Sequence, residues 1–177
     1  TVEGANILTR SMILFGQGAI RCHPFVQDEM RGALEKDLTR FDRAFFGHVG
    51  FVFQNVARTL WLALTNGAFA TVPVNGPAAR YYRRSTRPPA AFALAADVAM
   101  GTLGGSLKRK EALTGRLADI HAWLYLSSAA LKRFHDEGSK ERDLACLRWA
   151  CEYAHHQAQE AYLGFVANLP LRPAAWF

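Results

Sequence analysis

Cysteine is scarce in this sequence: the 177 residues include only three, at Cys22, Cys146 and Cys151. Three cysteines are too few for the disulfide framework on which small secreted domains depend, so we expect a reducing compartment, the cytoplasm. The N-terminus has no basic stretch followed by an apolar stretch, and the sequence therefore predicts no secretory signal peptide.

Long hydrophobic runs are also absent, although half of the residues are hydrophobic. No stretch reaches the roughly 18 consecutive apolar residues that indicate a membrane-spanning helix. The most apolar region, residues 49–69, is interrupted by four polar side chains: Gln54, Asn55, Arg58 and Asn66. We therefore expect no membrane span, and the chain is long enough for about one globular domain with a sizeable core.

Acidic residues are missing between Arg43 and Ala96, where six arginines stand: 43, 58, 80, 83, 84 and 87. The remainder of the chain holds 15 basic and 15 acidic residues, so the formal net charge of +6 comes entirely from this middle segment. A local basic region of this kind favours a polyanionic partner, such as a phosphate-bearing ligand, an acidic membrane surface or nucleic acid. The alternative is a solvated basic loop without a partner.

The densest part of that segment alternates arginines with aromatic residues, from Arg80 to Arg87. The planar guanidinium group of arginine binds phosphate through paired hydrogen bonds. The neighbouring Tyr81 and Tyr82 supply aromatic rings that stack on bases or lie at the level of lipid headgroups. We take four residues as candidate membrane or anion contacts: Arg80, Arg83, Arg84 and Arg87.

The hydrophobic pattern predicts helices nearly throughout and no strand of any length. We expect an all-α fold, a bundle of long antiparallel amphipathic helices with one irregular basic loop near residues 67–89, which holds a short helix around 78–84. Helices are expected over residues 6–20, 24–36, 37–66 and 89–103. Two more follow, with apolar residues at steps of three and four over residues 113–134 and 144–165. Their short connection predicts an antiparallel pair.

The helix over residues 37–66 carries apolar residues at the same steps, which predict its buried stripe. These residues are Phe41, Phe45, Val49, Val52, Val56, Leu60 and Ala63.

Two other sequence patterns resemble a metal-binding pair and a phosphate loop, but we interpret both as features of helix packing. Cys151 and His155 share a helix face as two metal ligands would, but Cys151 falls on the apolar stripe and no second ligand pair completes a tetrahedral set. The glycine-rich segment 101–108 lacks the spacing of a phosphate loop and follows no strand, so we interpret it as a helix break. The sequence therefore predicts no metal site.

Four segments resemble the acyl-CoA dehydrogenases, and within them the large bacterial long-chain type. The first is Glu3-Gly-Ala-Asn-Ile-Leu-Thr-Arg10, an EGxxxxxR motif, followed by Phe15–Pro24. The others are Phe46–Gly50, Leu103–Lys110 and Leu117–Tyr125. The resemblance implies that residues 1–36 end the helical C-terminal domain of such an enzyme and that residues 37–177 form an additional helical domain. Since the chain starts without Met and stops at Trp176-Phe177, we expect it to be part of a longer polypeptide.

The same resemblance implies that Glu3 is the catalytic base, which removes the α-proton of the acyl thioester while a hydride passes to the flavin. The base's backbone N–H would bind the thioester carbonyl, Gly4 would let the backbone approach the substrate, and Arg10 would help to bind it. Without the resemblance, Glu3 is simply an acidic residue that complements a helix N-terminus. Ala5 and Ile7 replace the Thr and Gln that help to hold flavin in many members.

The implied function is that of an FAD-dependent dehydrogenase that converts long-chain acyl-CoA to trans-2-enoyl-CoA in fatty acid β-oxidation. FAD would be bound mainly by residues upstream of this chain, so we expect the chain alone to be inactive. The implied partners are acyl-CoA, an electron-transfer acceptor protein and further copies of the chain. We expect a cytoplasmic location, peripheral on the inner membrane, and no nucleic acid. The alternative is an independent helical binding module whose basic loop grips a membrane surface or nucleic acid.

Overall fold

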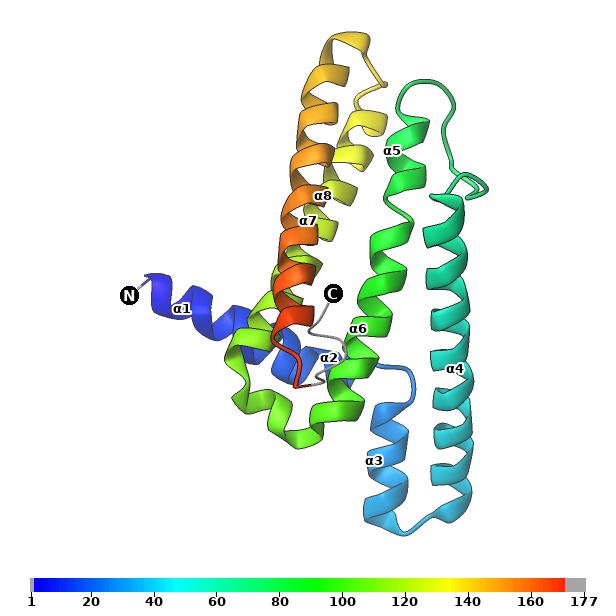
Figure 1. The fold of residues 1–177 in the computed structure, drawn as a ribbon, viewed down its shortest axis with the longest axis vertical. Coiled ribbons are helices and arrows are strands. Elements are labelled where there is room, and N and C mark those ends of the chain that lie inside the picture. Colours follow the sequence, from blue (N-terminus) through cyan, green and yellow to red (C-terminus); the bar gives the residue numbers. More distant parts are fainter. Residues whose placement is uncertain (1, 171–177) are drawn as a thin grey trace.

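The computed structural model describes residues 2–170, and these form an elongated bundle of helices with no strand among them (Figure 1). This confirms the predicted all-α fold. Trp176 and Phe177, where the sequence stops, lie outside the described residues. The predicted domain boundary between residues 36 and 37 falls in the turn between the third and fourth helices, and the division into two domains stays a prediction.

The N-terminal helix begins earlier than the sequence predicted. Helix α1 spans Val2–Leu8, the π-helix η1 continues over Thr9–Gly18, and α2 covers Ala19–Cys22. Glu3 and Gly4, expected in a loop before a helix at Asn6, therefore lie within α1. Glu3 is in the first turn, where a carboxylate complements the positive end of the helix dipole, which accounts for the earlier start.

Helices α3 (Val26–Glu35) and α4 (Leu38–Thr65) form a hairpin that runs along one side of the molecule (Figure 1). Asp37 caps α4, since its carboxylate accepts a hydrogen bond of 3.0 Å from the backbone N–H of Arg40. Gly32 permits the close approach of the two helices, because a Cβ there would lie 2.8 Å from the backbone nitrogen of Phe41. At the other end of α4, Asn66 and Gly67 have positive φ and stop the helix, as predicted.

The buried face of α4 differs from the predicted stripe. Phe45 and Leu60, both in that stripe, are 45% and 58% exposed, whereas Ala44, Asn55 and Leu62 are the buried residues of the helix. The helix is apolar on several sides, so periodicity alone did not reveal which side packs against α3 and the sixth helix. The polar Asn55 is buried because it donates a hydrogen bond to a carboxylate on that sixth helix.

The irregular segment contains the predicted short helix, and the following helix begins at Arg87, two residues earlier than predicted. Helix α5 spans Ala79–Arg84, α6 spans Arg87–Leu103, and a 3₁₀ turn, η2, spans Gly104–Arg109. Together, residues 79–109 are long and apolar enough to cross a membrane by length and composition alone. We interpret α6 as a bundle helix, because it packs against α4 and the following helix and carries the buried, hydrogen-bonded Asp97 in its middle.

The last two helices, α7 (Glu111–Asp136) and α8 (Leu144–Ala167), form the predicted antiparallel pair, joined through the 3₁₀ turn η3 (Glu141–Asp143). Their predicted stripes are largely buried. Leu117, Ile120 and Phe165 are almost completely enclosed and lie in the main apolar core, which also receives residues from α6. A second cluster, around Leu131 and Cys151, joins this pair to α5.

Candidate functional site

The four candidate arginines lie together on α5 and the start of α6. Arg80, Arg83 and Arg84 are exposed, and Arg87 is half-buried. Tyr81 is buried beneath them and anchors α5 to the bundle, with the Arg80 guanidinium 4.6 Å from the centre of its ring. Among the described residues, none of the four arginines forms an ion pair with a carboxylate, so their charge is not neutralised by the protein.

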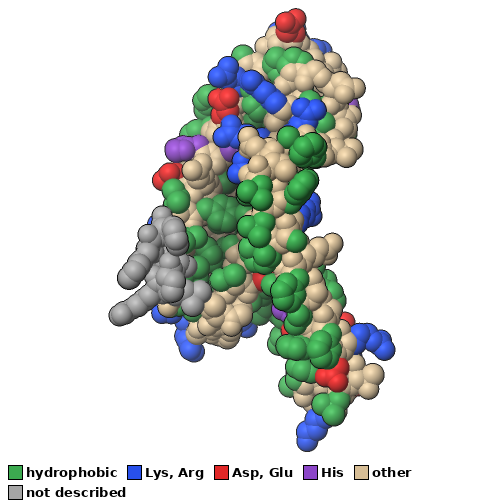
Figure 2. All heavy atoms as spheres, turned by 45° about the vertical axis from the view of Figure 1, so that its right-hand side comes forward, with side chains coloured by type: hydrophobic (Ala, Val, Ile, Leu, Met, Phe, Trp, Pro, Cys, Tyr) green, Lys and Arg blue, Asp and Glu red, His purple; other side chains and the backbone are tan. Residues whose placement is uncertain are grey.

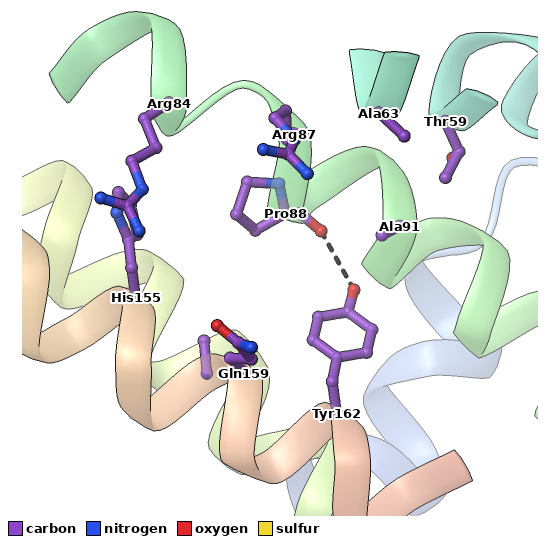
Figure 3. Close-up of a pocket in the computed structure, with 10 residues that line it drawn as sticks. Thr59, Ala63, Arg84, Arg87, Pro88, Ala91, His155, Gln159 and Tyr162 are labelled. Atoms are coloured by element: carbon purple, nitrogen blue, oxygen red, sulfur yellow. Dashed lines mark hydrogen bonds between the residues drawn. The ribbon is translucent and has the colours of Figure 1, made fainter. Parts of the chain in front are cut away.

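Two adjoining recesses open beside these arginines. The inner recess, of about 330 Å³, lies between α4, α5, α6 and α8 (Figure 3). It is lined by Thr59, Ala63, Arg84, Arg87, Pro88, Ala91, His155, Ala158, Gln159 and Tyr162. The outer recess, of about 410 Å³, is lined by Asn66, Arg80, Tyr81, Arg83, Arg84, Arg87 and Glu152. Arg84 and Arg87 line both recesses and thus stand between them.

Asn66 and Tyr162 hold the wall of the inner recess in place. The Arg87 guanidinium donates a hydrogen bond to the side-chain oxygen of Asn66, which fixes the start of α6 to the end of α4. The Tyr162 hydroxyl donates a 3.0 Å hydrogen bond to the backbone oxygen of Pro88 (Figure 3), and burial raises the pKa of this phenol, so it remains a donor. These contacts join α4, α6 and α8 around the recess.

His155 is the buried polar residue of the inner recess, only 7% exposed. Its Nε2 atom lies 3.1 Å from the Ser85 hydroxyl and 3.2 Å from the Ser127 hydroxyl, whereas Nδ1 is buried and has no hydrogen-bond partner within residues 2–170. Burial, and secondly the positive charge of Arg84, lowers the pKa of His155 to about 4. The imidazole is therefore neutral in the folded protein at neutral pH.

We expect His155 to make the protein less stable as the pH falls from 6.5 to 4. In the unfolded chain the imidazole takes up a proton near its ordinary pKa of about 6.5, whereas in the folded protein it resists protonation down to about 4. The unfolded state thus binds more protons in this window, which lowers the free energy of unfolding by up to about 3 kcal/mol. Urea unfolding at several pH values measures this loss.

His155→Gln is expected to flatten the pH dependence of unfolding between pH 6.5 and 4. His156→Gln is the matched control, because His156 is exposed on the same helix and its replacement should leave the curve unchanged. Equal curves for wild type and His155→Gln would contradict the assignment of a low pKa to His155.

The N-terminal candidates lie away from these recesses. Glu3 and Gly4 are exposed on α1, and the Glu3 carboxylate forms no hydrogen bond or ion pair with any described residue. Arg10, in the π-helix, is bound to α7: its Nε and Nη2 atoms each lie 2.5 Å from a carboxylate oxygen of Asp119. The hydrogen bonds to Asp119 raise the pKa of Arg10 and join η1 to α7. In the structure, Arg10 therefore stabilises the packing of these two helices.

A separate group of polar residues joins α3, α4 and α6. His23, His48 and Asp97 have ligand atoms within 4.8 Å of one another, close enough to hold a metal ion. However, His23 Nδ1 accepts hydrogen bonds from the backbone N–H groups of Phe25 and Val26, both 3.2 Å. Its proton must then be on Nε2, which donates to Asp97 at 3.2 Å.

That hydrogen-bond arrangement leaves no lone pair on His23 Nε2 for a metal. His48 in turn lies 2.8 Å from Glu29, and Asn55 donates to the second oxygen of Asp97. Burial, followed by the charge of His48, lowers the pKa of His23, which favours the neutral ring. We therefore interpret this group as a structural network that fixes three helices. Sequence reasoning missed it, since its members are far apart in the chain and have no recognisable spacing.

Sequence reasoning also identified only some of the residues that line the inner recess. The sequence identified Arg84 and Arg87, but His155 was considered only together with Cys151. The structure buries Cys151 in the apolar cluster, where desolvation raises the pKa of its thiol, and places His155 against Ser85, Ser127 and Arg84. The signal that could have found this site is the polar Ser127 and His155 within two otherwise apolar stripes.

Comparison with known proteins agrees with the resemblance in the sequence. Residues 20–177 match the family model described as acyl-CoA dehydrogenase, C-terminal, bacterial type. The matched region contains both recesses and the three-helix network, and it begins after the EGxxxxxR segment. No solved structure matches the chain.

Proposed function

Because this chain belongs to the family of bacterial-type acyl-CoA dehydrogenase C-terminal domains, we propose that it forms the C-terminal region of an FAD-dependent enzyme that oxidises long-chain acyl-CoA to trans-2-enoyl-CoA in β-oxidation. The family match over residues 20–177 carries this proposal. The EGxxxxxR segment at Glu3–Arg10 supports it independently, since it lies outside the matched region.

Glu3 is the proposed base in this reaction. Its carboxylate is exposed and bound to no described residue, so it is available to accept a proton from the α-carbon of a thioester. Gly4 leaves its side open, because a Cβ at this position would meet no atom within 4 Å. A substrate carbonyl could therefore approach the backbone here, and an N–H bonded to that oxygen would stabilise the negative charge that develops as the proton leaves.

The residues of this chain do not fit a flavin at the N-terminal segment. Ala5 and Ile7 are exposed and apolar, and they offer no hydrogen-bonding side chain where many superfamily members have Thr and Gln. We therefore assign the FAD site to residues outside this chain. In this proposal the chain supplies the proton acceptor, Glu3, and residues outside the chain supply the cofactor site.

We expect the purified 177-residue chain to be colourless and inactive even with added FAD, because Ala5 and Ile7 offer flavin no hydrogen bond and we assign the FAD site to other residues. The visible absorbance of the protein after gel filtration measures bound flavin, and dye reduction with a long-chain acyl-CoA measures activity. The full-length protein, treated in parallel, is the positive control. Flavin bound in a stoichiometric amount by the 177-residue chain would contradict this assignment.

A second proposed role, peripheral binding to an anionic membrane, is supported by the surface around the arginines. These four arginines have no carboxylate partner among residues 2–170, and they adjoin an exposed apolar face of α4. Figure 2 shows hydrophobic side chains along the molecule and basic side chains gathered near one end. The outer face of α4 consists of Phe45, Phe46, Val49, Phe53, Leu60, Trp61 and Leu64. Peripheral binding would place the enzyme at the membrane surface, into which its proposed substrate, long-chain acyl-CoA, partitions.

The proposed activity also implies partners beyond the substrate. An acyl-CoA oxidation needs an acceptor for its electrons, and we propose an electron-transfer protein for this role. We further propose a homo-oligomer that works in the cytoplasm, on the cytoplasmic face of the inner membrane.

A further inference from the structure

The residues that line the inner recess include two buried polar atoms that lack a hydrogen-bond partner in the described part of the chain. These are the Thr59 hydroxyl on α4 and His155 Nδ1 on α8, and both residues line the recess. An unsatisfied buried polar atom costs free energy, so such atoms are rare unless a ligand or water completes them. His155 lies beside the Arg84 guanidinium, whereas Thr59 lies at the other end of the recess (Figure 3). The unpaired His155 Nδ1 therefore indicates a polar group bound beside Arg84.

The charge at the same place indicates that this group is an anion. Arg84 and Arg87 both line the recess, and neither is paired with a carboxylate of the residues that the structure describes. Figure 3 shows the Arg84 guanidinium beside the His155 ring, and the effect of its charge on His155 agrees with that proximity. The long, exposed Arg84 side chain can rotate to admit a group between itself and the ring.

We propose that the inner recess binds the phosphate group of a small ligand, held by Arg84 and Arg87 and by a hydrogen bond from His155. A carboxylate has two oxygens, which one guanidinium fork satisfies, whereas a phosphate presents enough oxygens for two forks and further donors. His155 can donate from Nδ1, because Nε2 then accepts a hydrogen bond from Ser85 or Ser127. The volume of about 330 Å³ leaves room for an organic substituent.

Arg80 and Arg83 provide the matched control for this proposal. They lie on the same short helix as Arg84 and line the outer recess, but they do not line the inner one. The pair Arg84→Gln with Arg87→Gln therefore removes the same charge as Arg80→Gln with Arg83→Gln. Only the first pair removes the proposed phosphate contacts.

The first experiment is calorimetric titration of the full-length protein with inorganic phosphate, at an ionic strength held constant with sodium chloride. We expect saturable binding that the Arg84/Arg87 pair of substitutions weakens at least about tenfold and the Arg80/Arg83 pair weakens much less. Circular dichroism and melting in chloride show whether each variant is folded. No saturable phosphate binding by wild type, or equal weakening by the two pairs, would overturn the proposal.

A second measurement on the wild-type protein avoids dependence on the variants. Nitrogen-15 resonances of the histidine side chains report the protonation and hydrogen bonding of each ring nitrogen. Added phosphate should shift Nδ1 of His155 towards a hydrogen-bonded N–H, and the exposed His156 should shift no more than it does in chloride. An unchanged His155 spectrum at saturating phosphate would refute its contact with the anion.

Competition against inorganic phosphate distinguishes the source of the group. One arm compares coenzyme A with dephospho-coenzyme A, which lacks only the 3′-phosphate, and a second uses the soluble phospholipid dihexanoyl phosphatidate. Stronger competition by coenzyme A would assign its 3′-phosphate to the recess, and stronger competition by the phosphatidate would assign a lipid headgroup. If neither competes better than phosphate itself, the ligand is the free ion. The coenzyme A arm rests on the proposed acyl-CoA activity, whereas phosphate binding does not, so the two can fail separately.

Discussion

Replacing Glu3 with glutamine in the full-length protein should lower the rate of acyl-CoA oxidation by roughly 10²- to 10⁴-fold, which is the usual contribution of a positioned general base. The amide keeps the size and polarity of the carboxylate but cannot accept the α-proton. Bound flavin should be unaffected, since we assign the FAD site to residues outside this chain. Dye-linked turnover with a long-chain acyl-CoA measures the loss, and visible absorbance measures the flavin.

The size of this effect follows from the chemistry of the thioester. An α-proton is too weakly acidic for an ordinary carboxylate, so the base succeeds only if the carbonyl is polarised and the carboxylate loses its water. Glu3 is exposed in the structure described here, and a bound acyl chain would desolvate it and strengthen it as a base. The substitution removes the acceptor and leaves the polarising backbone N–H in place, so some residual rate should persist.

Glu160→Gln is the matched control for Glu3→Gln. Glu160 is an exposed carboxylate on α8, far along the chain from the proposed base, and its replacement changes the charge by the same amount. We expect wild-type turnover from this variant. Near wild-type turnover from Glu3→Gln, with the protein folded and its flavin bound, would show that Glu3 is not the base. The position of Glu3 in the first turn of α1 would then be explained by the helix dipole alone.

The boundaries of most helices could be predicted from local chemistry. Asp37 and Asn66 marked the ends of α4 because an acidic N-cap and a left-handed C-cap are properties of a few neighbouring residues. The stripes of α7 and α8 were equally predictable, since each helix has one clearly apolar side. The start of α1 was predicted wrongly, because a helix can extend through a segment such as Glu3-Gly4 whenever nothing local stops it.

The packing of α4 and the candidate sites depended on contacts between distant residues. The face of α4 that packs inward carries Asn55 and His48, polar residues that are tolerated because Asp97 and Glu29 bind them. A hydrophobic pattern cannot anticipate such pairs. The arginine cluster was visible in the sequence because its members are neighbours, but its recess was not, since Thr59 and His155 come from α4 and α8.

Replacing Arg80, Arg83, Arg84 and Arg87 with serine should reduce binding to anionic vesicles by about 10³-fold at low salt. Each basic residue near an anionic surface contributes about 1 kcal/mol, so the loss of four amounts to about 4 kcal/mol. The proteins are compared by co-sedimentation with vesicles that contain anionic phospholipid. At high salt the electrostatic part is screened, so wild type and variant should bind more nearly alike.

The control for this prediction must lower the net charge equally without touching the cluster. Four other exposed arginines serve, each replaced by serine: Arg109, Arg133, Arg142 and Arg148. Three of them, on α7, η3 and α8, already face carboxylates, so they are less available to a membrane. If both quadruple variants lose binding equally, attraction depends on net charge and the cluster has no special role. If the variant with all four arginines replaced binds as wild type does at low salt, the arginine cluster is not a membrane contact and the proposal is wrong. Binding by wild type that persists at high salt would measure a separate contribution from the exposed apolar face of α4, whose Leu64 is 85% exposed, because the hydrophobic effect is not screened by salt.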